Sequence, residues 1–111
     1  MSKLPEEEEK KVLEYFKILG IPEDEFNRLK LNAKSIVELA RDCDPYFIHE
    51  IEDFGRRIGH FERIAREAAR DEKIPWSDYV TFTLSLDRLF RSAEYEAIIA
   101  LKSNCGCKLK P

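Results

Sequence analysis

The feature that most constrains the fold is a run of apolar residues in the middle of the chain, which recur at alternating steps of four and three. Its members are Phe47, Ile51, Phe54, Ile58, Phe61, Ala65 and Ala68. This spacing puts all of these side chains on one face of an α-helix, and so regular a stripe is typical of a helical bundle or a coiled coil. With Asp44 as the N-cap and Pro45 in the first turn, we expect this helix to run to about Glu72.

A second apolar stripe follows the turn KIPWS and complements the first in side-chain size. It comprises Tyr79, Phe82, Leu86, Phe90, Ala93, Ala97 and Ala100. If the two helices fold back on each other, Ala65 faces Phe82 and Phe54 faces Ala93, so that large residues meet small ones. The segment YVTFTLSL alternates apolar and polar residues as a strand does, but no second strand is visible to pair with it. We therefore predict a helix over residues 75–103.

Two shorter amphipathic segments precede these helices, over residues 5–19 and 23–41. Pro5 and the glutamates after it suit a helix N-terminus, and Gly20 suits the position that follows a helix C-terminus. The second segment carries the apolar stripe Phe26, Leu29, Ala33, Ile36 and Ala40. We therefore predict an all-α protein with a single domain over residues 1–111. Its expected form is a four-helix up-down-up-down bundle with long third and fourth helices, and residues 104–111 form a tail.

Composition narrows the functional classes. Hydrophobic residues make up 43% of the chain, enough for a core, but no run of about 18 apolar residues could span a membrane. The N-terminus lacks the basic and then apolar pattern of a secretory signal, so we expect a cytoplasmic protein with no membrane partner. The net charge of −3 disfavours nucleic acid as a partner. Charged residues reach 37%, with no glutamine and one methionine, which follows the trend of thermophilic proteins.

The cysteines are expected to gather at one end of the bundle. Cys43 ends the second helix, Cys105 and Cys107 follow the fourth, and His49 lies one turn into the third. Three thiolates and an imidazole would complete a tetrahedral zinc shell, so zinc is a candidate cofactor. Three alternatives remain open: free thiols, a disulfide from Cys43 to one of the later cysteines, and a redox pair of Cys105 with Cys107.

Charged residues on the third helix are weaker candidates for a site. Arg56, Arg63, Arg66 and Arg70 follow its outer face and could bind anions, although nearby glutamates indicate a solvated surface with ion pairs. Glu50 and Asp53 have a Glu-x-x-Asp spacing, as found in metal-dependent all-α nucleotide pyrophosphatases. Here the acids lie beside or outside the apolar stripe, and a pair of Asp53 with Arg57 is the simpler expectation.

Two glycines and two aromatic residues indicate an interaction surface. Gly55 and Gly59 lie inside a helix, where glycine costs about 1 kcal/mol relative to alanine unless another element approaches closely. Trp76 and Tyr79 lie where the longer helices extend past the first. We therefore predict a homodimeric protein-interaction module. The alternatives are a metal-dependent enzyme on nucleotides or small phosphates, which we favour less, and an accessory nucleic-acid binder using the arginines of the third helix.

Overall fold

The computed structural model describes residues 4–105, and these residues form four α-helices with no strand among them. The helices are α1 (Glu6–Leu19), α2 (Glu23–Arg41), α3 (Phe47–Arg70) and α4 (Trp76–Cys105). The all-α class is confirmed. Helix α4 runs through Ser92 without a break and takes in residues 104 and 105 of the expected tail. The rest of that tail, residues 106–111, lies outside the described residues.

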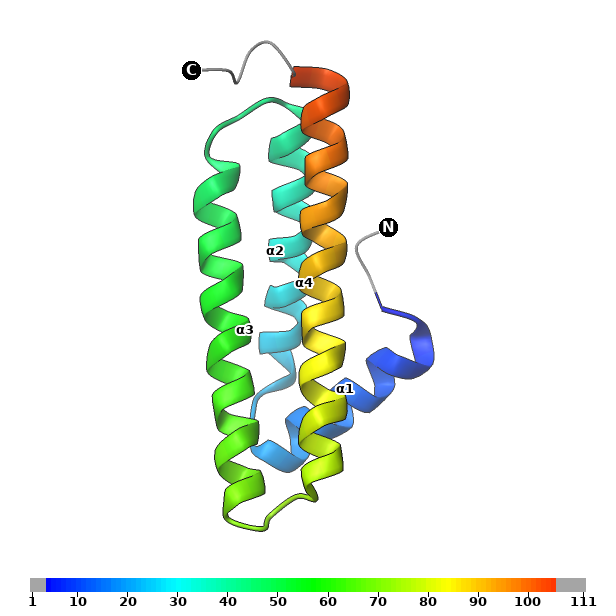
Figure 1. Cartoon of the computed structure of the whole chain (residues 1–111), viewed down its shortest axis with the longest axis vertical. Helices are drawn as coiled ribbons and strands as arrows, with labels where there is room; N and C mark the ends of the chain where they lie inside the picture. The colour runs from blue at the N-terminus through cyan, green and yellow to red at the C-terminus, as the bar shows by residue number, and fades with distance from the viewer. Residues whose placement is uncertain (1–3, 106–111) are drawn as a thin grey trace.

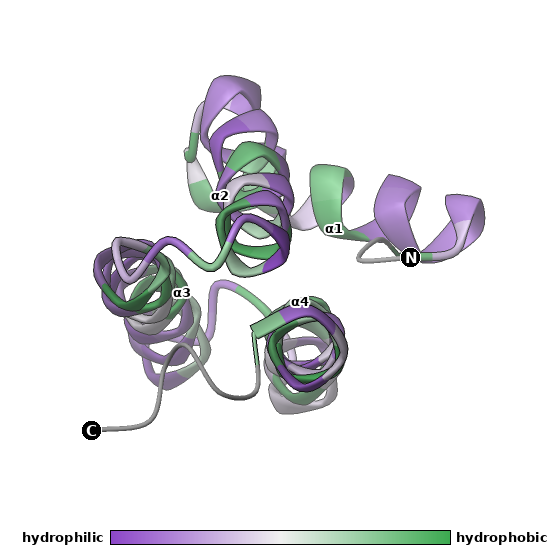
Figure 2. Cartoon of the chain, turned by 90° about the horizontal axis from the view of Figure 1, so that it is seen from above, coloured by the Kyte–Doolittle hydropathy of each residue, from purple (hydrophilic) through white to green (hydrophobic). Residues whose placement is uncertain are grey.

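The three longer helices lie side by side along the long axis of the molecule. Figure 1 shows that α3 runs opposite to α2 and α4 opposite to α3, while α1 lies obliquely near the end where α2 begins. Viewed along the long axis in Figure 2, α2, α3 and α4 form a triangle and α1 extends outside it. The structure differs from the expected four-helix bundle at α1, which is not equivalent to the other three helices. A helix of 14 residues with only Val12 and Phe16 buried has too short an apolar face to line the whole bundle.

The core consists of the apolar stripes expected from the sequence. The expected stripe of α2 is buried along its whole length. On α3 the buried residues run from Phe54 to Ala68, whereas Phe47 and Ile51 at the start of the expected stripe are half-buried. On α4 the buried residues run from Phe82 to Ala100, and Cys105 at the end of the helix is also buried. Each large side chain removed from water contributes roughly 1.5–3 kcal/mol. The hydrophobic effect along these stripes therefore holds α2, α3 and α4 together.

Helix α1 closes one end of this core. The ring of Phe16 lies 5.3 to 5.7 Å from the rings of Phe61, Phe26 and Phe82, which belong to α3, α2 and α4 respectively. Polar contacts flank this ring cluster. Lys30 of α2 donates to Glu9 at 2.9 Å, and Arg88 of α4 donates to Glu8 at 2.6 Å. Tyr15 donates to Asp78 of α4 at 3.2 Å. The position of α1 is thus fixed by one buried ring and by pairs to both α2 and α4.

The strand-like segment YVTFTLSL is helical. Thr81 and Thr83 donate their hydroxyl groups to the carbonyls of Ser77 and Val80, each at 3.0 Å, so these polar side chains are satisfied within the helix. The alternation arises because apolar residues lie on two sides of α4: Phe82 points into the core, whereas Leu84 is 59% exposed. No helix of the described residues is apolar over a length sufficient to cross a bilayer.

Candidate functional site

The side of α4 that faces away from the core carries a continuous row of side chains, which we call the outer stripe. Its members are Trp76, Val80, Leu84, Asp87, Arg91, Tyr95, Ile98 and Lys102. Steps of three and four residues place them on one face of the helix. The buried residues of α4 between Phe82 and Ala100 occupy the opposite face. Helix α4 is therefore apolar on two sides, and only one of them is used in the described chain.

The apolar members of the outer stripe are well exposed. The exposed fractions are 57% for Trp76, 40% for Val80, 59% for Leu84, 66% for Tyr95 and 44% for Ile98. Scattered exposed apolar residues are normal on protein surfaces, but an aligned patch is typical of an interaction site. A hollow of ≈ 480 Å³ that is open to solvent lies in the middle of the stripe, bordered by Leu84, Asp87 and Arg91.

A pair of carboxyl groups lies at the inner edge of the outer stripe. Asp87 of α4 is half-buried and faces Glu62 of α3. Burial, and then the hydrogen bond to Asp87 and its charge, raise the pKa of Glu62 to about 8. Ionised carboxylates only accept hydrogen bonds, so a proton must lie between the two groups for them to bond. The Oε2 of Glu62 is buried and has no hydrogen-bond partner among the described residues.

The predicted interaction residues fall in different environments. Trp76 is exposed on the outer stripe, and its ring lies 4.8 Å from that of Tyr79, which is half-buried. Gly55 lies beside the ring of Phe90, and a Cβ at this position would meet that ring at 3.7 Å, which is an ordinary van der Waals contact. Apart from its chain neighbours and the backbone of its own helix, a Cβ at Gly59 would have no described atom within 4 Å. Gly55 thus borders a packed ring without a close approach that would require glycine, whereas Gly59 borders open space.

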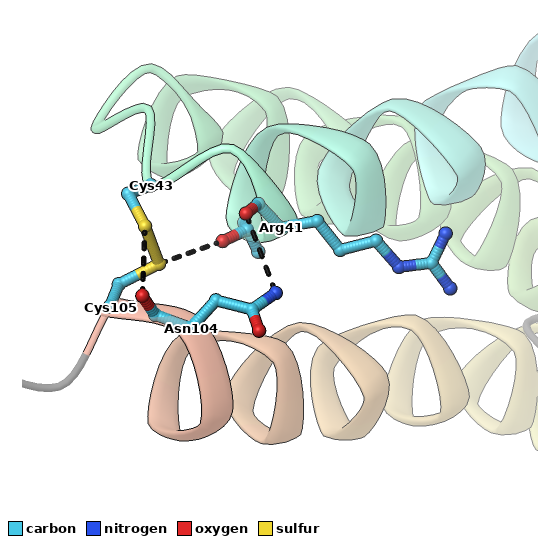
Figure 3. Close-up of a disulfide and its surroundings, with 5 residues drawn as sticks. Arg41, Cys43, Asn104 and Cys105 are labelled. Atoms are coloured by element: carbon cyan, nitrogen blue, oxygen red, sulfur yellow. Dashed lines mark hydrogen bonds between the residues drawn. A yellow bond between two sulfur atoms is a disulfide. The ribbon is translucent and has the colours of Figure 1, made fainter.

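Cys43 and Cys105 lie at the end of α4 opposite to Trp76. Cys43 and Cys105 form a disulfide with their Cα atoms 5.5 Å apart, and it joins the end of α2 to the last residue of α4 (Figure 3). The expectation that Cys43 lies near a later cysteine is confirmed for Cys105. Beside the disulfide, Asn104 donates to the carbonyl of Arg41 at 3.5 Å. Cys105 is buried, with an exposed fraction of 1%.

Both sulfur atoms lie close to main-chain carbonyls. The Sγ of Cys105 is 3.3 Å from the oxygen of Ala40, and the Sγ of Cys43 is 3.6 Å from the oxygen of Asn104. A thiol can donate a weak hydrogen bond, so the same carbonyls can accept from both cysteines after reduction. The site can therefore hold both cysteines in the dithiol form without leaving the buried thiol unpaired.

Cys43 occupies an unusual backbone position. Its φ is 58°, in the left-handed region that glycine adopts without strain. It lies just past the end of α2, where its N–H bonds to Ala40 at 3.2 Å and the N–H of Asp44 bonds to Leu39 at 3.0 Å. Such helix ends favour glycine. A cysteine here costs roughly 1–2 kcal/mol of backbone strain, which the disulfide can offset.

The described residues do not assemble the expected zinc shell. His49 is largely exposed and lies 4.0 Å from Glu52. No group of three or more His, Cys, Asp or Glu side chains within residues 4–105 is arranged to hold a metal ion. In the disulfide, the sulfurs of Cys43 and Cys105 are not thiolates. Cys107, the remaining member of the expected shell, lies outside the described residues.

The acidic residues of α3 bind another part of the chain. Asn32 of α2, which is buried, donates through Nδ2 to Glu50 at 3.0 Å and to Asp53 at 3.3 Å. Arg57 donates to Asp53 at 3.0 Å, as the sequence predicted. The two hydrogen bonds of Asn32 join α2 to α3, whereas the pair of Arg57 with Asp53 lies within α3. The candidate anion-binding residues Arg56, Arg63, Arg66 and Arg70 are all exposed on α3.

Sequence reasoning missed most of the outer stripe, as well as Asn32 and the pair of Glu62 with Asp87. One signal for the stripe was present. The alternation in YVTFTLSL records a helix with apolar residues on two sides, which a search for a single stripe treats as a conflict. Comparison of the chain with protein-family models found no matching family, and comparisons with curated proteins and with solved structures found no match.

Proposed function

We propose that this protein is a homodimeric protein-interaction module that associates through the outer stripe of α4. The observation that supports this is the second apolar face of α4, whose five apolar side chains are between 40% and 66% exposed. A helix that is apolar on both sides is typically covered on both sides. The stripe extends the expected contact from the region of Trp76 and Tyr79 along the whole helix.

Helix α4 is also held rigidly at both ends. At its first turn, Tyr15 of α1 donates to Asp78 at 3.2 Å, and at its last turn the disulfide joins Cys105 to α2. Between these points its inner face is packed in the core. A surface that is already ordered loses little conformational entropy on association, so more of the buried apolar area contributes to affinity.

Sedimentation velocity of the wild type over a concentration series tests the proposal. We expect a dimer at high micromolar concentration. Leu84→Glu and Tyr95→Glu each place a charge in the stripe and should give monomers that keep the helical circular dichroism spectrum. Leu31→Glu is the matched control, because Leu31 is 62% exposed on α2, outside the stripe, and this variant should remain dimeric. A wild type that is monomeric throughout, or a dimer unaffected by either stripe variant, would overturn the proposal.

A further inference from the structure

The order of residue types along the outer stripe is complementary to the same order read backwards. From the start of α4 it presents an aromatic residue, two aliphatic residues and an acid, and then a base, two apolar residues and a second base: Trp76, Val80, Leu84, Asp87, Arg91, Tyr95, Ile98 and Lys102. If two copies lie antiparallel, the first member meets the last and the two central members meet each other. Every such encounter pairs apolar with apolar, acid with base, or aromatic ring with cation.

The spacing permits these encounters to occur together. When the stripe members are paired in order from its two ends, the midpoints of the four pairs agree to within one residue. One residue is about 1.5 Å along a helix, so all four pairs can form at once. We infer that the stripe of α4 binds the same stripe of a second copy, antiparallel about a twofold axis near residue 89, with Asp87 opposite Arg91 of that copy. This inference rests on the proposed function and specifies its interface.

Four kinds of contact form in this arrangement, and the symmetry repeats each of them. Val80 packs on Ile98 of the second copy, and Leu84 packs on Tyr95 of the second copy. The hollow of ≈ 480 Å³ between Leu84 and Arg91 receives that tyrosine ring. At the ends of the interface, the ammonium group of Lys102 approaches the ring of Trp76, an attraction of the cation–π kind.

Charge selects the antiparallel arrangement over a parallel one. In a parallel pair in register, Asp87 would face Asp87 and Arg91 would face Arg91, and like charges in an interface are strongly unfavourable. In the antiparallel pair each of these residues meets its opposite. The neighbouring cation, Arg88, is bound to Glu8 of α1 at 2.6 Å, so Arg91 of the second copy supplies positive charge from the open side.

A pair of charge reversals tests this register. Asp87→Arg places arginines at both central positions, and Arg91→Asp places aspartates at both. Each variant alone should dimerise at least about tenfold more weakly than the wild type, a change of about 1.4 kcal/mol. Mixed together, the two variants pair arginine with aspartate at both contacts and should form a heterodimer within about threefold of wild-type affinity. The double variant, Asp87→Arg with Arg91→Asp, should again form a homodimer.

Native mass spectrometry of the mixture distinguishes the heterodimer by mass, and sedimentation gives the affinities. Glu38→Arg on the exposed side of α2 is the control for an acid-to-arginine change and should dimerise like the wild type. Circular dichroism checks that each variant folds. If a central variant fails to fold, Val80→Glu and Ile98→Lys apply the same test at exposed positions, because only their heterodimer pairs glutamate with lysine.

The outcomes separate this inference from the proposed function. A heterodimer from the mixture supports the antiparallel register. A wild-type dimer that Leu84→Glu disrupts, but in which neither charge-reversed pair of variants recovers affinity on mixing, overturns the register and leaves the outer stripe as the interface. A wild type that stays monomeric overturns both.

Discussion

The carboxyl groups of Glu62 and Asp87 face each other across the contact of α3 with α4, and their chemistry depends on that contact. Burial, followed by the hydrogen bond to Asp87 and its charge, raises the pKa of Glu62 to about 8. The sequence shows only two acids among many on helix surfaces. Their proximity depends on how α3 and α4 are rotated about their axes, which no local pattern specifies. The same is true of Asn32, whose buried amide binds Glu50 and Asp53.

This pair makes the stability of the protein depend on pH in a defined direction. Unfolded glutamate has a pKa of about 4.3, so between that pH and about 8 the folded state holds a proton that the unfolded state has lost. The free energy of unfolding contributed by Glu62 therefore falls as the pH rises through this window. Glu62→Gln, which keeps a donor toward Asp87 and cannot ionise, should remove the dependence and stabilise the protein by about 1 kcal/mol at pH 9.

Urea denaturation of the wild type and Glu62→Gln at pH 5, 7 and 9 measures this difference. Glu67→Gln, at an exposed position of the same helix, is the control and should follow the wild type at each pH. Equal pH dependence in the wild type and Glu62→Gln would show that Glu62 ionises normally in the folded protein.

Helix α4 shows how far sequence patterns specify an element. Its start, its length and its buried face follow from the apolar stripe and from the turn before it, and the structure agrees with them to within about two residues. The outer stripe was harder to predict, because side chains such as Leu84 and Tyr95 have no partner in the described chain. Their role depends on another surface, which the pattern of one helix does not describe.

The disulfide fastens α4 to α2 at the end of the molecule farthest from α1, and its effect on stability is measurable. It closes a loop with a sequence separation of 62, so it restricts the unfolded chain considerably. We expect reduction to lower the free energy of unfolding by about 2–4 kcal/mol. The main-chain carbonyls beside both sulfurs should let the reduced protein keep its fold.

Urea denaturation with and without a reductant measures this contribution, and intact mass confirms the redox state. Two variants separate the cross-link from the backbone strain. Under reducing conditions Cys43→Gly should be more stable than Cys43→Ser by about 1 kcal/mol, because the φ of 58° suits glycine. If reduction leaves the unfolding transition of the wild type unchanged, the disulfide does not constrain the chain as described.

The molecule as a whole consists of three long helices, α2, α3 and α4, and the shorter helix α1 closes one end of their core. The all-α class, the four helices and the core stripes were predictable because each follows from local spacing of apolar residues. The oblique position of α1 was not, because an amphipathic face does not set a crossing angle. What places α1 is a set of contacts with distant residues: Phe16 among the rings of the other helices, and Glu8 and Glu9 with cations of α4 and α2.

Phe16 should therefore be a position on which the stability of the entire molecule depends. Its ring is 1% exposed and contacts one aromatic ring from each of the other three helices. Replacing it with alanine removes these contacts and leaves a cavity where all four helices meet, so Phe16→Ala should cost about 3–5 kcal/mol. Ile18→Ala on the same helix is the control, because Ile18 is 61% exposed and its loss should cost less than about 0.5 kcal/mol. Thermal unfolding followed by circular dichroism compares the two variants. If α1 instead unfolds separately, Phe16→Ala will produce an early partial transition and leave the melting of α2, α3 and α4 unchanged.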